Sequence, residues 1–176
     1  MQSFRCWLWA TPMLLAGCAS SNPDRSLPTN FSELTLSVAG GYVMQPDSAS
    51  DCSAPFISYK LDQTTRQLGW DGCYVDANSS PSTYKSHSDS RILSQDEFSS
   101  VLSEFDKVQI GSRNTCGADM PLMTLDLTVG GRTSGYIDDF YSGCDAATRA
   151  RANPEGRTWV MYLGNLTAVL EKLSRI

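Results

Sequence analysis

The first 17 residues determine the environment in which the rest of this chain folds. They start with one basic residue, Arg5, continue in an apolar run too short to span a bilayer, and end in the small residues Ala16 and Gly17. These are the features of a secretory signal peptide, which is removed on export. Exported domains fold where disulfides form and persist, so the cysteines left in the mature chain are expected to pair.

The residues at the predicted cleavage site carry a more specific signal. Leu15-Ala16-Gly17-Cys18 resembles the lipobox of bacterial lipoproteins. This resemblance implies that residues 1–17 are a cleaved lipoprotein signal peptide. It also implies that Cys18 carries a covalent diacylglycerol and a further acyl chain such as palmitate. Ala19 and Ser20, with no Asp directly after the cysteine, resemble the sorting pattern for the outer membrane, facing the periplasm, in a Gram-negative cell.

The charge of the chain argues against two classes of partner. It has 14 Lys and Arg against 19 Asp and Glu, a formal net charge of −5, and signal cleavage removes only Arg5 from this balance. Nucleic acid and anionic lipid headgroups are bound by clusters of basic side chains, so neither is an expected partner. No later segment has the roughly 18 apolar residues of a spanning helix. The acyl chains on Cys18 are therefore the expected link to the bilayer, and no other cofactor is expected.

Four cysteines remain after the lipidated one: Cys52, Cys73, Cys116 and Cys144. An even number in an exported domain favours two disulfides. Cys116 and Cys144 lie almost symmetrically about Gly130-Gly131, which is typical of a two-residue hairpin turn. Cys52 and Cys73 flank a predicted turn at Asp62–Thr65 in the same way. We therefore predict the pairs Cys52–Cys73 and Cys116–Cys144. A metal site is the alternative, but no pair has the C-x₂₋₄-C spacing typical of zinc ligands.

Alternating apolar and polar residues predict about five strands, over residues 34–38, 56–61, 67–75, 123–129 and 132–141. Residues 42–44 are expected to continue the first strand after a bulge at the preceding glycines. A four-residue turn starting at Asp62 would place Tyr59 opposite Leu68. The two-glycine turn would place Leu125 opposite Tyr136.

Two helices are expected from the apolar periodicity. Ser94 and Glu97 form a capping box, and the residues after it place one apolar stripe toward the core: Phe98, Val101, Leu102 and Phe105. A second helix is expected near Trp159–Leu173, with an apolar stripe that begins at Trp159. Residues 77–91 and 145–157 are polar and are expected to be surface loops.

These elements predict a two-layer α+β domain. Their order, β-β-β-α-β-β-α, favours a sheet of about five antiparallel strands with both helices on one face. Residues 18–30 would be the lipidated cysteine and a flexible tether, and residues 31–176 a single domain. The Leu93–Phe98 helix start and the segment 140–144 resemble uncharacterised domains in other bacterial lipoproteins, a resemblance that implies no activity.

Three groups of polar residues are candidate chemical sites. His87, the only histidine, lies between Ser86 and Ser88 in the expected loop and is interpreted as solvated, because catalytic Ser–His pairs are brought together by a fold. The acidic group comprises Asp119, Asp138, Asp139 and Asp145; a cation site and acid–base catalysis are alternatives to the expected solvated rim. The arginines Arg149, Arg151 and Arg157 are weak evidence for an anion site without a glycine cradle.

Aromatic residues of the strands provide the candidate binding surface: Trp70, Tyr74, Tyr136 and Tyr141. They would form it if they lie on the sheet face that the helices leave open, because Tyr and Trp favour interfaces. We therefore expect a non-enzymatic domain that binds an unknown protein or cell-wall partner, with no catalytic and no metal-binding residues. The alternative is an inhibitor of a secreted hydrolase, a protease or lysozyme, with one of the two polar loops inserted into the enzyme.

Overall fold

The computed structural model describes residues 26–40, 50–52, 54–76, 83–112, 121–139 and 146–175. Several predictions fall outside these residues: the signal peptide and lipobox, the first part of the tether, the continuation of the first strand at 42–44, the Cys116–Cys144 disulfide, Asp119, Asp145 and Tyr141.

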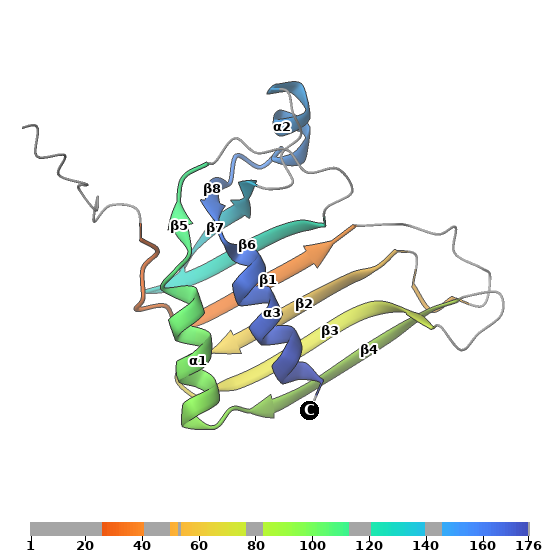
Figure 1. Ribbon diagram of the computed structural model, residues 1–176, viewed down its shortest axis with the longest axis vertical. Helices are drawn as coiled ribbons and strands as arrows, with labels where there is room; N and C mark the ends of the chain where they lie inside the picture. Colours follow the sequence, from red (N-terminus) through yellow and green to blue (C-terminus); the bar gives the residue numbers. More distant parts are fainter. Residues whose placement is uncertain are drawn as a thin grey trace, which may run out of the picture.

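One eight-stranded sheet organises the described residues, in the order β4-β3-β2-β1-β6-β7-β8-β5 (Figure 1). The strands are β1 Glu33–Ala39, β2 Phe56–Asp62, β3 Gln67–Asp76, β4 Thr83–Ile92, β5 Gln109–Ile110, β6 Leu122–Val129, β7 Arg132–Asp138 and β8 Thr158–Met161. Only β7 and β8 pair in parallel among these strands. The predicted α+β class and the mainly antiparallel sheet are confirmed, but the prediction of about five strands is wrong.

Three helices accompany the sheet: α1 Gln95–Phe105, α2 Ala146–Ala152 and α3 Leu163–Ser174. The helices α1 and α3 cross the same face of the sheet, whereas α2 lies beyond the ends of β7 and β8 (Figure 1). The capping box of α1 is confirmed, since the Ser94 side chain accepts from the Glu97 N–H and the Glu97 side chain accepts from the Ser94 N–H. Within the described residues, no helix is both long and apolar enough to cross a membrane.

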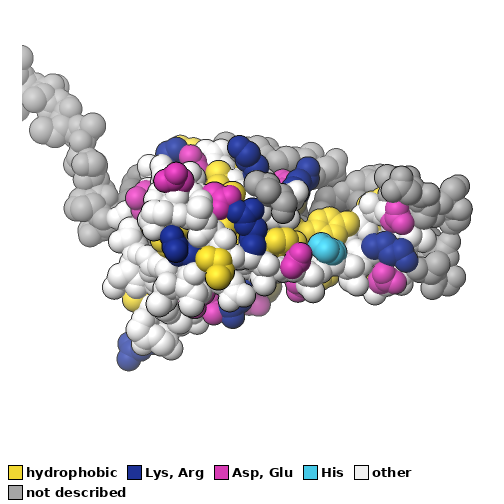
Figure 2. All heavy atoms as spheres, turned by 90° about the horizontal axis from the view of Figure 1, so that it is seen from below, with side chains coloured by type: hydrophobic (Ala, Val, Ile, Leu, Met, Phe, Trp, Pro, Cys, Tyr) yellow, Lys and Arg dark blue, Asp and Glu magenta, His cyan; other side chains and the backbone are white. Residues whose placement is uncertain are grey.

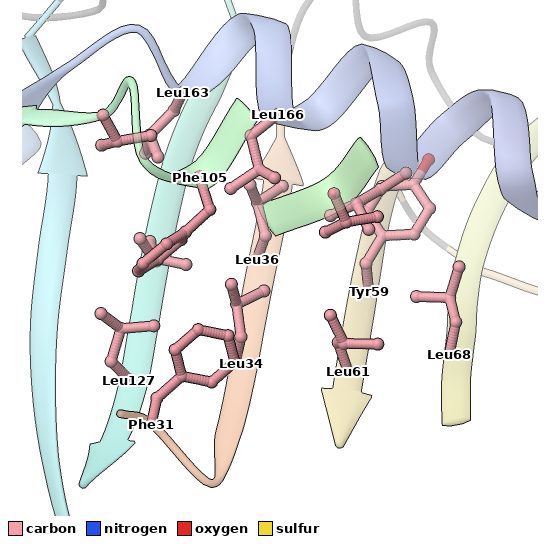
Figure 3. Packing of buried hydrophobic residues seen from close by; sticks show 14 of the residues in the cluster. Phe31, Leu34, Leu36, Tyr59, Leu61, Leu68, Phe105, Leu127, Leu163 and Leu166 are labelled. Atoms are coloured by element: carbon pink, nitrogen blue, oxygen red, sulfur yellow. The ribbon is translucent and has the colours of Figure 1, made fainter. Parts of the chain in front are cut away.

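The core lies between the sheet and these two helices (Figure 3). Period-2 alternation in β1 and β6 places Leu34, Leu36, Leu125 and Leu127 on the helix-facing side, where each is fully buried. Each helix packs an apolar stripe against this face of the sheet. The buried residues are Phe98, Val101 and Phe105 in α1, and Leu163, Leu166, Leu170 and Leu173 in α3. Each element therefore buries the face that its own periodicity marks.

The predicted pairing of residues across the strands can be compared with the structure at two hairpins. The glycine turn is confirmed: Gly130 and Gly131 have φ values of 56° and 77°, and Leu125 pairs with Tyr136. The other register is wrong by two residues, because Tyr59 pairs with Trp70 rather than Leu68.

The cause of that shift is a turn that starts one residue later than predicted. Asp62 remains in β2, and its carboxylate accepts hydrogen bonds from the Thr65 N–H at 2.7 Å and the Thr65 hydroxyl at 2.9 Å. The loop therefore comprises residues 63–66, and Arg66 closes it with a φ of 57°. A shift of two residues leaves every side chain on the same face of the sheet.

Both expected loops contain regular structure. Residues 83–92 form β4, which pairs with β3 along its whole length, and residues 146–152 form α2. Trp159 does not begin the last helix, because it lies in β8, which pairs with β7. The helix α3 starts after Tyr162, whose left-handed φ of 73° separates the strand from the helix. For β4 and β8, backbone pairing with another strand overrides the local pattern.

The described end of the expected tether is packed against the domain. Leu27 is buried in the core, and Ser26 forms a β-bridge with Gln109. Ser26 and Leu27 therefore belong to the folded domain rather than to the expected tether, and burial of the Leu27 side chain helps to hold them there.

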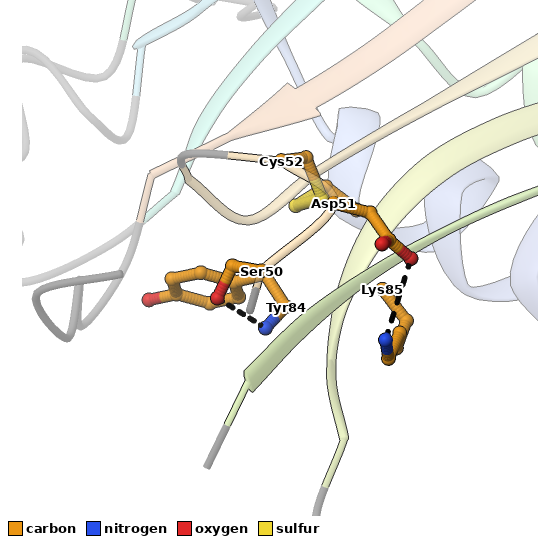
Figure 4. The surroundings of a disulfide bond; sticks show 6 residues. Ser50, Asp51, Cys52, Tyr84 and Lys85 are labelled. Carbon is orange, nitrogen blue, oxygen red and sulfur yellow. Dashed lines mark hydrogen bonds and ion pairs between the residues drawn. A yellow bond between two sulfur atoms is a disulfide. The ribbon is translucent and has the colours of Figure 1, made fainter. Parts of the chain in front are cut away.

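The Cys52–Cys73 disulfide is confirmed, with a Cα–Cα distance of 6.1 Å. Cys73 lies opposite Phe56 in the β2–β3 ladder, and Cys52 precedes that ladder. The bond therefore holds the segment before β2 beside the start of β4, where Ser50 and Asp51 contact Tyr84 and Lys85 (Figure 4).

Candidate binding groove

A groove of about 550 Å³ lies between the C-terminal half of α3 and the helix-facing side of β1 to β4. It forms because the strands continue past the C-terminal end of α3, which leaves part of that face uncovered (Figure 1). The sheet contributes Val38, Ile57, Tyr59, Trp70, Tyr74 and His87, and α3 contributes Thr167, Glu171, Ser174 and Arg175. Its volume lies in the range of small-ligand sites, roughly 300–1,000 Å³.

Aromatic rings form the floor of the groove. Tyr59 and Trp70 pair across β2 and β3 and are almost fully buried, whereas Tyr74 is 38% exposed. Trp70, Gly72 and Tyr74 alternate with outward residues along β3, so they share the helix-facing side. A Cβ atom at Gly72 would lie 3.0 Å from two ring carbons of Tyr74. The ring of Tyr74 therefore lies close against the backbone of Gly72, and the missing side chain makes room for it.

Polar groups of α3 form the opposite wall. Burial raises the pKa of Tyr59 to about 12, and the nearby Ser174 side chain opposes this shift. Burial also raises the pKa of Tyr74. Glu171 and Arg175 form an ion pair one helical turn apart. Donors and acceptors thus lie beside the aromatic floor.

The hydroxyl groups in the groove are engaged with the helix backbone. The Thr167 hydroxyl donates to the Leu163 carbonyl at 2.9 Å, and the Ser174 hydroxyl donates to the Glu171 carbonyl at 2.9 Å. A nucleophilic hydroxyl needs a base that accepts its proton. These contacts therefore favour a ligand-binding surface over nucleophilic chemistry.

His87 lies on the strand β4 rather than in a loop, opposite Gly72. Its side chain lines the groove, whereas Ser86 and Ser88 point to the other face of the sheet because side chains alternate along a strand. The adjacent serines are therefore not positioned as partners of His87.

The predicted aromatic surface is on the other side of the sheet from the one expected. Trp70, Tyr74 and Tyr136 all lie on the helix-facing side. Trp70 and Tyr74 line the groove, but Tyr136 is 8% exposed and belongs to the core. The aromatic residues were identified from composition and strand pattern; the face on which they lie depends on where the helices pack.

The described carboxylates of the acidic group are buried, so the expected solvated rim is wrong. Asp138 is 2% exposed and Asp139 is fully buried. The Asp138 carboxylate accepts a hydrogen bond from the N–H of Leu163, the first residue of α3, at 3.0 Å. Tyr162, the residue before the helix, gives it no side-chain cap. Asp138 thus satisfies one of the backbone donors at the N-terminus of α3.

Two of the three arginines, Arg149 and Arg157, contact different groups. Arg157 donates to the Asp126 carboxylate at 2.6 and 3.5 Å and to Glu155 at 2.8 Å. Burial lowers the pKa of Arg157, but its bonds to Asp126 and Glu155 outweigh burial and raise it. Arg149 lies over the Trp159 ring, 4.3 Å from its centroid. These contacts link α2 and its following loop to the sheet.

The groove residues that α3 contributes were not identified from the sequence: Thr167, Glu171, Ser174 and Arg175. Their spacing of three and four residues places them along one side of α3, beside its buried leucine stripe. This spacing is the sequence pattern from which their common position on α3 could have been predicted.

No protein-family model matches the chain, and no curated protein matches it significantly. In the described parts of the chain, no three His, Cys, Asp or Glu side chains are grouped as a metal site. The groove is therefore the candidate functional site of the described residues.

Proposed function

We propose that this protein is a membrane-anchored, periplasm-facing lipoprotein whose domain binds a protein or cell-wall partner in the groove beside α3, without catalysing a reaction. The observation that carries this proposal is the groove itself, where Trp70 and Tyr74 lie beside the charged and hydroxyl groups of α3. Recognition sites commonly combine apolar rings with a few polar groups that orient the ligand.

The anchor is supported by the resemblance of Leu15–Cys18 to a lipobox. Replacing the acylated cysteine, Cys18→Ser, should move the protein out of the outer-membrane fraction, because the described residues hold no helix that spans a bilayer. Density-gradient fractionation measures this change. An unaltered membrane fraction for Cys18→Ser would contradict lipid anchoring.

The groove is tested with two variants of similar exposure on opposite faces of the sheet. Tyr74 is 38% exposed in the groove, and Phe56 is 41% exposed on the other face. We expect Tyr74→Ala to reduce co-sedimentation with purified cell-wall sacculi, or crosslinking to a protein partner in intact cells, whereas Phe56→Ala should retain it. Equal binding by the two variants would contradict a role for the groove.

The alternative of a hydrolase inhibitor depended on an inserted loop. Most of the first expected loop is the strand β4, and the start of the second is the helix α2. Both segments are therefore less suited to insertion into an active site than the sequence suggested. Assays against a panel of proteases and lysozymes at micromolar concentration separate the two functions.

A further inference from the structure

The floor of the groove is a row of residues from four neighbouring strands. Val38 of β1 pairs with Ile57 of β2. Ile57 pairs with Gly72 of β3, which in turn pairs with His87 of β4. Because neighbouring strands lie about 4.8 Å apart, this row extends for roughly 14 Å across the sheet. The Tyr74 ring packs against Gly72, so apolar groups form the floor from Val38 to Tyr74.

Polar side chains border this floor along one side and at one end. Glu171 and Arg175 lie on α3 beside the floor, and 45% and 74% of their side chains are exposed. His87 lies at the β4 end of the row and is also exposed. Figure 2 shows the histidine at the surface, with hydrophobic and acidic side chains beside it. A ligand in the groove therefore contacts an apolar floor and polar groups around its edge.

The charges of the groove cancel. Glu171 and Arg175 form an ion pair with each other. Among the described residues that line the groove, no other side chain is Asp, Glu, Lys or Arg. A charged ligand would lose contacts with water without gaining an unpaired opposite charge, which costs free energy. The groove therefore favours an uncharged ligand.

We propose that the groove binds an uncharged oligosaccharide, which in the cell envelope is the glycan chain of the cell wall. A pyranose ring has an apolar face of C–H groups and hydroxyl groups around its edge. The apolar face fits against the Tyr74 side chain, which is 38% exposed, while the hydroxyls bond to Glu171, Arg175 and His87. The groove volume of about 550 Å³ suits more than one sugar ring. This inference rests on the binding function proposed above and specifies its ligand.

Two other ligand classes fit the groove less well. An acyl chain has no polar atoms along its length, so it would cover Glu171 and Arg175 without replacing their contacts with water. A cell-wall stem peptide carries charged groups, whose natural partners in the groove are already paired with each other.

The groove lies far from the proposed point of attachment. Ser26 forms a β-bridge with Gln109 of β5, which is the edge of the sheet opposite β4. Cys18 and Ser26 are eight positions apart in the sequence, a distance of at most roughly 28 Å. The lipid on Cys18 would thus hold the β5 edge near the bilayer, whereas the groove lies on the β1 to β4 half of the sheet (Figure 1). This placement favours a ligand in the cell wall over a lipid headgroup.

Titration with a soluble oligosaccharide tests the ligand class. The probe is a chitin oligosaccharide, an uncharged chain of N-acetylglucosamine, added to the purified mature protein in a detergent without sugar headgroups. We expect saturable binding by calorimetry, with an affinity that is unchanged between about 0.05 and 0.5 M NaCl, because a neutral ligand has no charge to screen. Absence of saturable binding, or an affinity that falls about tenfold over this range, would overturn the proposal.

Variants on the floor test the contact with the ring. Tyr74→Ala should weaken binding of the oligosaccharide about tenfold or more, because it removes the aromatic surface, whereas Tyr74→Phe should stay within about twofold of the native protein. Phe56→Ala, on the other face of the sheet, is the matched control and should bind normally. Equal affinities for Tyr74→Ala and Phe56→Ala would overturn the proposal.

Variants on α3 test the polar edge without altering the floor. Glu171→Ala should weaken binding about tenfold, because the hydroxyls of the sugar lose a charged acceptor. Lys172→Ala is the matched control, since Lys172 is the exposed neighbour of Glu171 and does not line the groove. Circular dichroism verifies that each variant is folded. Unchanged affinity for Glu171→Ala in folded protein would refute the polar contact.

Competition on sacculi separates this inference from the proposed function. Free chitin oligosaccharide should displace the protein from sacculi, whereas free stem peptide should not. If binding to sacculi or to a protein partner requires Tyr74 but resists the oligosaccharide, the saccharide inference fails and the groove keeps its proposed function. Displacement by the stem peptide alone has the same meaning.

Discussion

The close contact between Gly72 and Tyr74 leads to a quantitative prediction about the floor of the groove. A methyl group at Gly72 would lie 2.9 Å from the Phe56 carbonyl oxygen and 3.0 Å from two carbons of the Tyr74 ring. Gly72→Ala must therefore displace the ring, the backbone of β2, or both. Forcing extra atoms into a packed site costs typically about 1–3 kcal/mol. We expect a loss of that size in the free energy of unfolding, with weakened binding in the groove.

Gly69 provides a matched control on the same strand. A methyl group there would have its nearest contact at 3.9 Å, with the Asp89 carbonyl oxygen. Without a clash, replacing glycine by alanine commonly stabilises by about 0.4–1 kcal/mol, because it restricts the unfolded chain. Gly69→Ala should thus be as stable as the native protein or slightly more stable.

Urea unfolding measures both variants. The midpoint should fall for Gly72→Ala and not for Gly69→Ala, at an unchanged slope. The double variant Gly72→Ala/Tyr74→Ala separates the two contacts, since it removes the ring but leaves the Phe56 oxygen. If Gly72→Ala unfolds at the same urea concentration as Gly69→Ala, the close packing inferred for the groove floor is wrong.

Three further measurements test other contacts. Replacing the disulfide by alanine at Cys52 and its partner should lower the free energy of unfolding by about 3 kcal/mol, since the cysteines are 21 residues apart; an unchanged urea midpoint would contradict this. Asp138→Ala should cost about 1–3 kcal/mol by leaving the buried N–H of Leu163 without its acceptor; calorimetry would detect this, and an unaltered melting temperature would refute the capping role. The hydrogen bond from Arg91, followed by that from the helix N-terminus, lowers the pKa of Glu97 to about 2, so the stability from Glu97 is fully present above its ordinary pKa near 4.5 and is lost as pH falls from there toward 2. Acid unfolding of Glu97→Gln should lack that part of the pH dependence, and identical acid profiles would show that the interaction contributes nothing.

Features set by short-range contacts were predicted well. The capping box at Ser94 depends on a residue three positions away, and the glycine turn determines the pairing of Leu125 with Tyr136. The Cys52–Cys73 pair also followed from its position around a hairpin. In each case the signal is a local pattern, either a cap or a hairpin turn, from which the positions of the flanking residues can be counted.

The strands β4 and β8 show why the strand number was wrong. The exposed central residues of β4 are polar on both faces, so it has no clear apolar alternation, and its pairing with β3 supplies the regular structure. In β8, four residues next to a helical pattern become extended because they pair with β7. Asp138 is a comparable case: its carboxylate is buried because the fold brings the start of α3 to it. The partners of β8 and of Asp138 are not adjacent in the sequence, whereas β4 directly follows its partner β3.

The groove required both kinds of information. Trp70 and Tyr74 were identified from the sequence as candidate binding residues, on the expectation that they lie on the sheet face without helices. Their true position beside Glu171 and Arg175 depends on how α3 crosses the strands.

The sequence by itself determined which residues of most strands face the same side, where α1 begins, and how the Gly130-Gly131 hairpin turns, because alternation, capping and turn geometry are local properties. Only the tertiary structure decided the eight-stranded sheet, the burial of Asp138 and Asp139, and the groove between sheet and helix. These features depend on contacts between separate strands and helices. Local periodicity in the sequence does not specify which strands and helices pack together.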